Sequence, residues 1–75
     1  MAIMQNTLKV LRAQHNLTQD DLAVKVGVTR TTITYLEKNQ YMPSLALAVK
    51  IARFFDQPIE SIFIVNLEDE NNSSL

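Results

Sequence analysis

The residues best suited to binding another molecule follow one another between Arg30 and Lys38. This stretch supplies a guanidinium, an ammonium, several threonine hydroxyls and a phenol. On a helix at about 100° per residue, five of these side chains share an arc of roughly 140° that holds no acid: Arg30, Thr31, Thr34, Tyr35 and Lys38. Their chemistry is hydrogen bonding and positive charge. The pattern favours recognition of a polar or negatively charged surface.

The opposite arc of the same helix holds Thr32, Ile33, Leu36 and Glu37, so one side packs while the other is displayed. A solvated helix face normally mixes charges of both signs, and threonine is a poor helix former. Short donors and acceptors are the groups that reach base edges in the major groove of DNA. An exposed face that merely tolerates these residues is the alternative interpretation.

Composition excludes several classes of function. The chain of 75 residues has no cysteine, one histidine (His15) and one glycine (Gly27). Thiol chemistry, a cysteine-based zinc site and a glycine-rich phosphate loop are therefore absent. We expect no enzyme, metal, cofactor or small-molecule ligand. The longest apolar run, residues 45–49, is too short to span a membrane. The first residues do not form a signal peptide, so we expect a cytoplasmic protein without a membrane partner.

Local signals predict the helices that position the polar arc. A first amphipathic helix is expected over residues 7–15, with Asn16 in the left-handed conformation that ends it. Thr18 and Asp21 form a capping box that starts a second helix. Gly27 ends that helix, because a left-handed residue is least strained as glycine. Thr29 caps the third helix almost at once.

The third helix should end near Lys38, with Asn39 as a left-handed C-cap. Ser44 caps a fourth helix that is apolar nearly all round, over residues 45–55, and is the best candidate for the buried centre. Pro58 suits the first position of a short fifth helix. The prediction is an all-α domain of five helices.

The second and third helices form a tight corner, because only about three residues separate them. Gly27 is the hinge of this helix–turn–helix. Six small or apolar residues occupy the positions that must pack for two helices to meet at such a corner: Leu22, Ala23, Val26, Val28, Ile33 and Leu36. An ordinary helical hairpin has no reason to satisfy all these constraints together.

Residues 7–63, including "LTQDDLAVKVGVTRTTITYLEKN", resemble the Cro and lambda-repressor type of helix–turn–helix domain, the XRE family. The resemblance implies a five-helix fold in which the third helix enters the major groove of DNA. It implies base contacts from Arg30, Thr31 and Tyr35, with Thr34 close by. It also implies phosphate contacts from Gln19, Thr32 and Lys38 and from the loop of Asn39, Gln40 and Tyr41. The family often has glycine where this chain has Asn39, and the loop is poor in Lys and Arg.

Arg12 and Glu37 form a candidate structural ion pair. Glu37 lies at the edge of the packing arc and is the only acid in its helix. Similar proteins pair an arginine of the first helix with this glutamate. We expect a partly buried pair that orients the third helix, and two unrelated solvated charges are the alternative.

The chain ends differ in character from the helices. The segment "IFIVNL" has strand composition, and the only other strand-like piece is Met1–Met4. We expect the two to pair in a small antiparallel sheet, giving a domain over residues 1–67. The remaining residues, 68–75, read as an acidic and polar flexible tail. Without their three acids, the rest of the chain carries a net charge of +2.

A two-stranded ribbon is marginal by itself, so a second copy is expected to cover it. An isologous homodimer through Ile62, Ile64, Val65 and Leu67 would set two recognition helices about 34 Å apart, one turn of DNA. A monomer whose last strand only covers its own core is the alternative.

The sequence thus indicates a sequence-specific DNA-binding transcriptional regulator, most simply a repressor that binds an inverted repeat as a homodimer. The alternative from a different class is an antitoxin-like module that uses the same fold to grip a partner protein.

Overall fold

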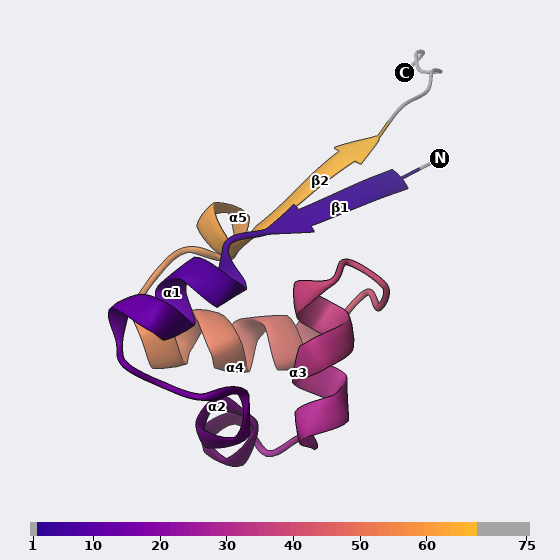
Figure 1. The fold of residues 1–75 in the computed structure, drawn as a ribbon. Helices are drawn as coiled ribbons and strands as arrows, with labels where there is room; N and C mark the ends of the chain where they lie inside the picture. Colours follow the sequence, from indigo (N-terminus) through magenta and orange to yellow (C-terminus); the bar gives the residue numbers. More distant parts are fainter. Residues whose placement is uncertain (1, 68–75) are drawn as a thin grey trace.

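A computed structural model describes residues 2–67 of the chain, with the side chains of residues 5–65. Five helices form a bundle from which a two-stranded ribbon projects (Figure 1). The expected fold is confirmed. Within the described residues, no helix has the length and apolar character needed to cross a membrane. The elements in order are β1 (Ala2–Asn6), α1 (Leu8–Gln14), α2 (Gln19–Val26), α3 (Arg30–Glu37), α4 (Leu45–Phe55), α5 (Ile59–Ile62) and β2 (Phe63–Leu67).

Side-chain caps start the central helices where the sequence predicts them. The hydroxyl of Thr18 accepts a hydrogen bond from the backbone N–H of Asp21, and the Asp21 carboxylate accepts one from the N–H of Thr18, each at 3.0 Å. Thr29 caps α3 and Ser44 caps α4 by accepting from the N–H three residues on. Each cap satisfies N–H groups that lack a partner within the helix.

Left-handed residues follow the ends of α1, α2, α3 and α4. Gly27 has φ of 75°, and Asn16, Asn39 and Asp56 have φ between 54° and 59°. Asn and Asp tolerate this region better than other non-glycine residues. Two boundaries differ from expectation. Pro58 is the N-cap of α5 and not its first helical residue. Helix α1 spans Leu8–Gln14, one residue shorter at each end than expected.

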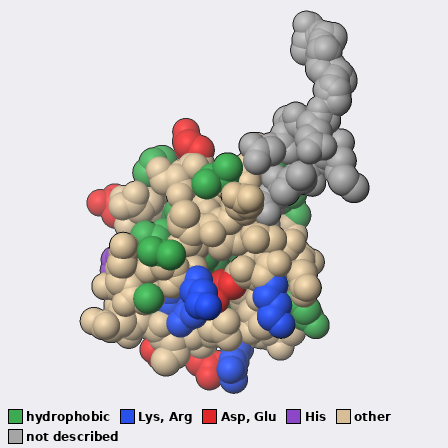
Figure 2. All heavy atoms as spheres, turned by 45° about the horizontal axis from the view of Figure 1, so that its top comes forward, with side chains coloured by type: hydrophobic (Ala, Val, Ile, Leu, Met, Phe, Trp, Pro, Cys, Tyr) green, Lys and Arg blue, Asp and Glu red, His purple; other side chains and the backbone are tan. Residues whose placement is uncertain are grey.

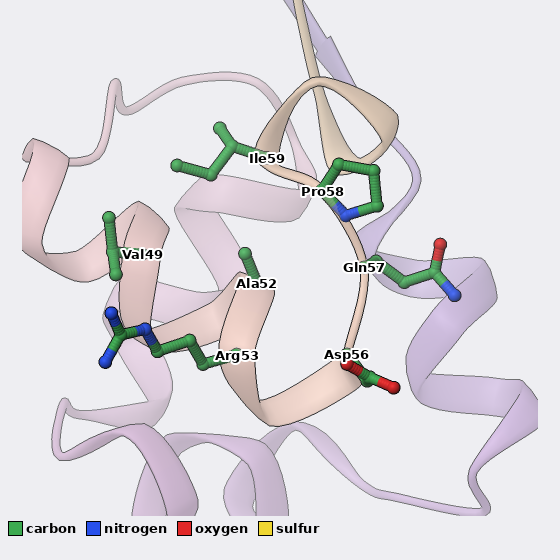
Figure 3. A pocket seen from close by; sticks show the side chains of 7 residues that line it. All are labelled: Val49, Ala52, Arg53, Asp56, Gln57, Pro58 and Ile59. Carbon is green, nitrogen blue, oxygen red and sulfur yellow. The ribbon is translucent and has the colours of Figure 1, made fainter.

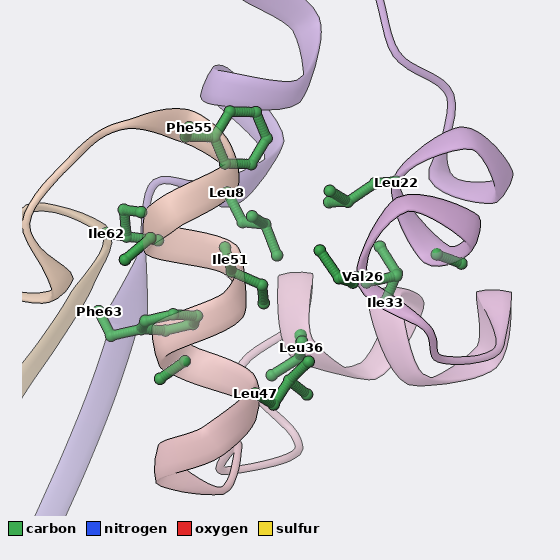
Figure 4. Packing of buried hydrophobic residues seen from close by; sticks show 13 residues of the cluster. Leu8, Leu22, Val26, Ile33, Leu36, Leu47, Ile51, Phe55, Ile62 and Phe63 are labelled. Atoms are coloured by element: carbon green, nitrogen blue, oxygen red, sulfur yellow. The ribbon is translucent and has the colours of Figure 1, made fainter.

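The core lies between α4 and the other four helices, as Figure 4 shows. Ile51 of α4 is fully buried, together with Leu8, Leu22, Ile33, Leu36 and Ile62. The expectation that the fourth helix supplies the buried centre is confirmed, and its apolar character extends beyond the buried side, because Leu45 is 75% exposed and Phe54 is 38% exposed. Helix α4 is central, but its first and last turns also present apolar side chains to solvent.

The two terminal strands pair antiparallel, from Ala2 opposite Leu67 to Asn6 opposite Phe63. Phe63 is buried against the helices, whereas Ile64 and Val65 are 41% and 43% exposed. Ile62 needs a correction as a dimer-interface residue: its side chain is fully buried in the chain's own core and cannot meet a second copy. The side chain of Leu67 and the expected tail of residues 68–75 lie outside what the structure describes.

The capping box predicts a specific acid sensitivity. Hydrogen bonding to the backbone of Thr18, and then to its side chain, lowers the pKa of Asp21. A lowered folded-state pKa gives stability that is complete above the unfolded value of about 4 and is lost as pH falls through the folded value. In urea titrations at pH 7 and pH 3, we expect Asp21→Asn to lose less unfolding free energy on acidification than the wild type. An equal loss in both proteins would contradict this role of Asp21.

Candidate nucleic-acid interface

The corner between α2 and α3 depends on backbone geometry at Gly27. The N–H of Gly27 donates to the carbonyl of Val24 at 3.4 Å, and the N–H of Val28 donates to that of Ala23 at 3.0 Å. A Cβ on Gly27 would find its nearest neighbour, Lys50 Nζ, at 3.9 Å, which is ordinary contact. Space therefore does not require glycine here, and the positive φ of 75° does.

Helix α3 has one dry side and one displayed side. Ile33 and Leu36 are fully buried. The side chains of Arg30, Thr31, Tyr35 and Lys38 are exposed, with Tyr35 at 47%. Thr32 and Thr34, the other two residues of this helix that are predicted to contact DNA, are half-buried. The structure thus brings the predicted base-contact residues onto one side of a single helix.

The side chain of Arg12 in α1 forms an ion pair with Glu37, the last residue of α3. The distance from Arg12 Nε to Glu37 Oε2 is 2.8 Å, and Arg12 Nη2 donates to the other carboxylate oxygen at 3.2 Å. Only 16% of the arginine side chain and 6% of the glutamate side chain are exposed. The hydrogen bond to Glu37 raises the pKa of Arg12, and the negative charge of the same carboxylate adds to this against the effect of burial. Arg12 also donates to the carbonyl of Leu17.

Gln19 extends this pair into a polar chain that reaches the displayed face. Its Nε2 donates to Glu37 Oε1 at 3.0 Å, and its Oε1 accepts from the hydroxyl of Thr34 at 3.0 Å. That hydroxyl also lies 3.1 Å from the carbonyl of Arg30. The resemblance assigned Gln19 to a phosphate and Thr34 to the base edges. In the structure both side chains are occupied in joining α2 to α3.

The other predicted phosphate-contact residues near α3 make hydrogen bonds to residues close to them in the sequence. The hydroxyls of Thr32 and Thr29 lie 3.1 Å apart at the start of α3. At its end, the N–H of Asn39 donates to the carbonyl of Leu36, and the N–H of Gln40 donates to that of Tyr35. Gln40 and Tyr41 are exposed in the loop that follows. Apart from Gln19 in α2, the predicted phosphate-contact residues thus lie in the first turn of α3 and directly after its end.

Asn6 was missed by the sequence interpretation. Its amide donates to the carbonyl of Leu36 at 2.7 Å and to Asn39 Oδ1 at 2.8 Å. Its own oxygen accepts from the N–H of Leu8 at 3.0 Å. Only the last of these bonds could be predicted from the local sequence, because the Asn6 side chain accepts from a backbone N–H just two residues further on. The other two cross 30 and 33 residues of sequence.

Two surface hollows flank the helices. The first, of about 400 Å³, is lined by α4 and the start of α5, from Val49 to Ile59, and includes none of the predicted contact residues (Figure 3). The second, of about 630 Å³, includes Gln19 and Arg30 and lies between the α1–α2 connection and the start of α3. It therefore adjoins the displayed face.

Lys and Arg side chains lie on the lower half of the face in Figure 2, with Asp and Glu side chains between and beside them. Hydrophobic side chains on the same face are scattered, which is normal for a protein surface.

The known proteins that this chain resembles are helix-turn-helix or DNA-binding proteins. A family model described as helix-turn-helix matches residues 8–62. A protein of Methanocaldococcus jannaschii named an uncharacterized HTH-type transcriptional regulator is 62% identical over 61 residues, which cover 81% of this chain and 92% of that protein. YgzD of Bacillus subtilis carries the same description and is 46% identical over 68 residues, covering 91% of this chain and all of that protein.

A crystal structure of a candidate DNA-binding protein from Bacteroides fragilis has a similar fold, with a TM-score of 0.70 and 30% identity. The match covers 80% of this chain and 97% of that one.

Proposed function

Since the chain belongs to the Cro and lambda-repressor type of helix-turn-helix family, we propose that it binds double-stranded DNA in a sequence-specific way and regulates transcription. In this proposal α3 lies in the major groove. The protein represses by occupying an inverted-repeat operator as a homodimer.

The two-sided character of α3 carries the proposal. Arg30, Thr31 and Tyr35 are exposed on the same helix whose other side buries Ile33 and Leu36. Arginine can donate two hydrogen bonds to guanine, and threonine offers a hydroxyl and a methyl group to thymine or phosphate. Helix α3 is joined to α1 and α2 by the hydrogen bonds that connect Arg12, Glu37, Gln19 and Thr34. A fixed helix with free donors is what direct readout of base edges needs.

Phosphate contacts are proposed on both sides of α3. Lys38 and the backbone of residues 39–41 would meet one strand, and Thr32 would meet a phosphate near the start of the helix. The side-chain amide of Gln19 already has partners, so we propose that Gln19 contacts a phosphate through its backbone. It lines the second hollow, which adjoins the displayed face. Such contacts set register and orientation without reading sequence.

The experiment that tests the function is selection of bound sequences from random duplex DNA, followed by salt titration of the enriched sequence. We expect an inverted repeat with half-sites about 10 bp apart and affinity that falls linearly on a log–log plot against salt. If no sequence is enriched, the antitoxin-like interaction module becomes the better reading of the fold.

Arg30→Ala and Lys38→Ala should affect DNA binding differently. Loss of a base-reading arginine is expected to cost about 1–3 kcal/mol on the selected site and to relax preference at one base pair, because the guanine edge loses its donors. Loss of a phosphate-binding lysine should weaken all sequences alike. Binding of each variant to the site and to its single-base mutants measures this. Identical behaviour of both variants on every duplex would refute the division of roles.

The dimer is proposed to form through the ribbon. Ile64 and Val65 are exposed apolar residues of β2, and a two-stranded sheet leaves an open edge on each strand. Light scattering after size exclusion should give twice the chain mass for the wild type. Val65→Lys should give a monomer with unchanged helix content, while Val24→Lys, at an equally apolar exposed position on α2, should stay dimeric. A monomeric wild type at high micromolar concentration would rule the dimer out.

A further inference from the structure

Asn6 connects three elements through one short side chain. It is the last residue of β1, where it pairs with Phe63 of β2. Its amide donates to Leu36, in the last turn of α3, and to Asn39, the first residue after the α3 cap. Its oxygen accepts from Leu8 at the start of α1. In Figure 1 the end of β1 nearest the helices leads directly into α1.

These bonds fix the point at which the loop leaves α3. The carbonyl of Leu36 already accepts from the N–H of Asn39 at 3.0 Å, and the Asn6 amide becomes its second donor. Asn39 sits in the left-handed region, with φ of 59°. Holding its side chain at 2.8 Å therefore holds the direction of the backbone that follows. Residues 40 and 41 are exposed immediately beyond this point.

We propose that Asn6 is a positioning residue for DNA binding: it aims the backbone of residues 39–41 at a phosphate. This role rests on the proposed function. Asn6 itself touches no DNA. The N–H groups of Asn39 and Gln40 already donate to carbonyls of α3, so the phosphate contact is made further along the loop. A loop that is ordered before the complex forms binds a phosphate more strongly than a mobile loop does.

The test uses variants that separate the three bonds. Asn6→Ala removes all of them. Asn39→Gly removes only the bond between Asn6 and Asn39, since glycine adopts the left-handed backbone freely. Thr7→Val is the matched control, because it removes the neighbouring hydrogen bond from Thr7 to the carbonyl of Ser61, which does not involve α3.

For Asn6→Ala we expect binding to weaken about fivefold, the net contribution of roughly one hydrogen bond, and to weaken equally for every duplex. Base preference stays unchanged. The slope of log affinity against log salt also stays near that of the wild type, because the loop contact carries no charge. Asn39→Gly weakens binding in the same way, and adding it to Asn6→Ala causes no further loss. Thr7→Val keeps the wild-type affinity.

A second readout needs no DNA. Amide hydrogen exchange at Asn39 and Gln40 should accelerate in Asn6→Ala and Asn39→Gly but not in Thr7→Val, at matched global stability. If the wild type selects a site but both variants keep its affinity and its exchange rates, only the role of Asn6 is overturned. If the wild type binds no duplex with a salt-dependent affinity, the proposed function fails and this role fails with it. Should Asn6→Ala not fold, Asn39→Gly alone decides.

Discussion

Replacing Glu37 with alanine is expected to lower the free energy of unfolding by about 3–5 kcal/mol. The Glu37 side chain is 6% exposed, and its carboxylate accepts from both Arg12 and Gln19. Its removal leaves a guanidinium that is 16% exposed without its anionic partner, and an amide without its acceptor. An unpaired buried charge costs far more than an intact pair gains. For a domain of this size, such a loss consumes much of the total stability.

Urea unfolding at pH 7, followed by circular dichroism, measures this effect. Glu60→Ala is the control, because it removes the same side chain from an exposed position and should change stability by about 0.5 kcal/mol or less. The double variant Arg12→Met/Glu37→Leu should recover much of the loss, since an apolar pair leaves no charge buried. A Glu37→Ala protein within about 1 kcal/mol of wild type would show that the pair is effectively solvated.

Ile33→Ala is expected to cost about 2–5 kcal/mol of folding stability. Ile33 is fully buried on the dry side of α3, where Figure 4 shows it near Leu22 and Val26 of α2. Truncation removes apolar contacts and leaves a cavity that two packed helices cannot easily close. The variant should bind DNA more weakly only in proportion to the fraction that is unfolded.

Thr31→Ala, two residues away on the displayed side, is the matched control. It should leave the unfolding free energy within about 0.5 kcal/mol of wild type and still alter binding to the selected site. Thermal unfolding and DNA titration of both variants, run below the melting temperature of Ile33→Ala, separate the two sides of α3. The assignment of sides would be wrong if Thr31→Ala proved the more destabilising change.

Features that depend on neighbouring residues were predictable from the sequence. The capping box at Thr18, the left-handed Gly27 and Asn39, and the caps at Thr29 and Ser44 are all confirmed. Each is determined within about four residues, so sequence spacing carries the information. The strand pair was predictable for another reason: each terminal segment had strand composition and only the other could satisfy its backbone.

Features that depend on distant residues were predicted less well. Ile62 reads as part of an exposed strand segment, yet α5 turns it into the core. Gln19 offers an amide at a helix start, and no local pattern shows that Glu37 and Thr34 will engage it. Asn6 lies 33 residues from Asn39. Polar side chains have several acceptable partners, and only the folded arrangement selects among them.

The separation between the two sides of α3 has a consequence for how such a protein can diversify. The residues at positions 30, 31 and 35 meet solvent, while the core is closed by 33 and 36. Exchange of the outer three therefore leaves the interior packing intact. New target preferences are accessible by substitution without refolding the scaffold, in evolution as in engineering.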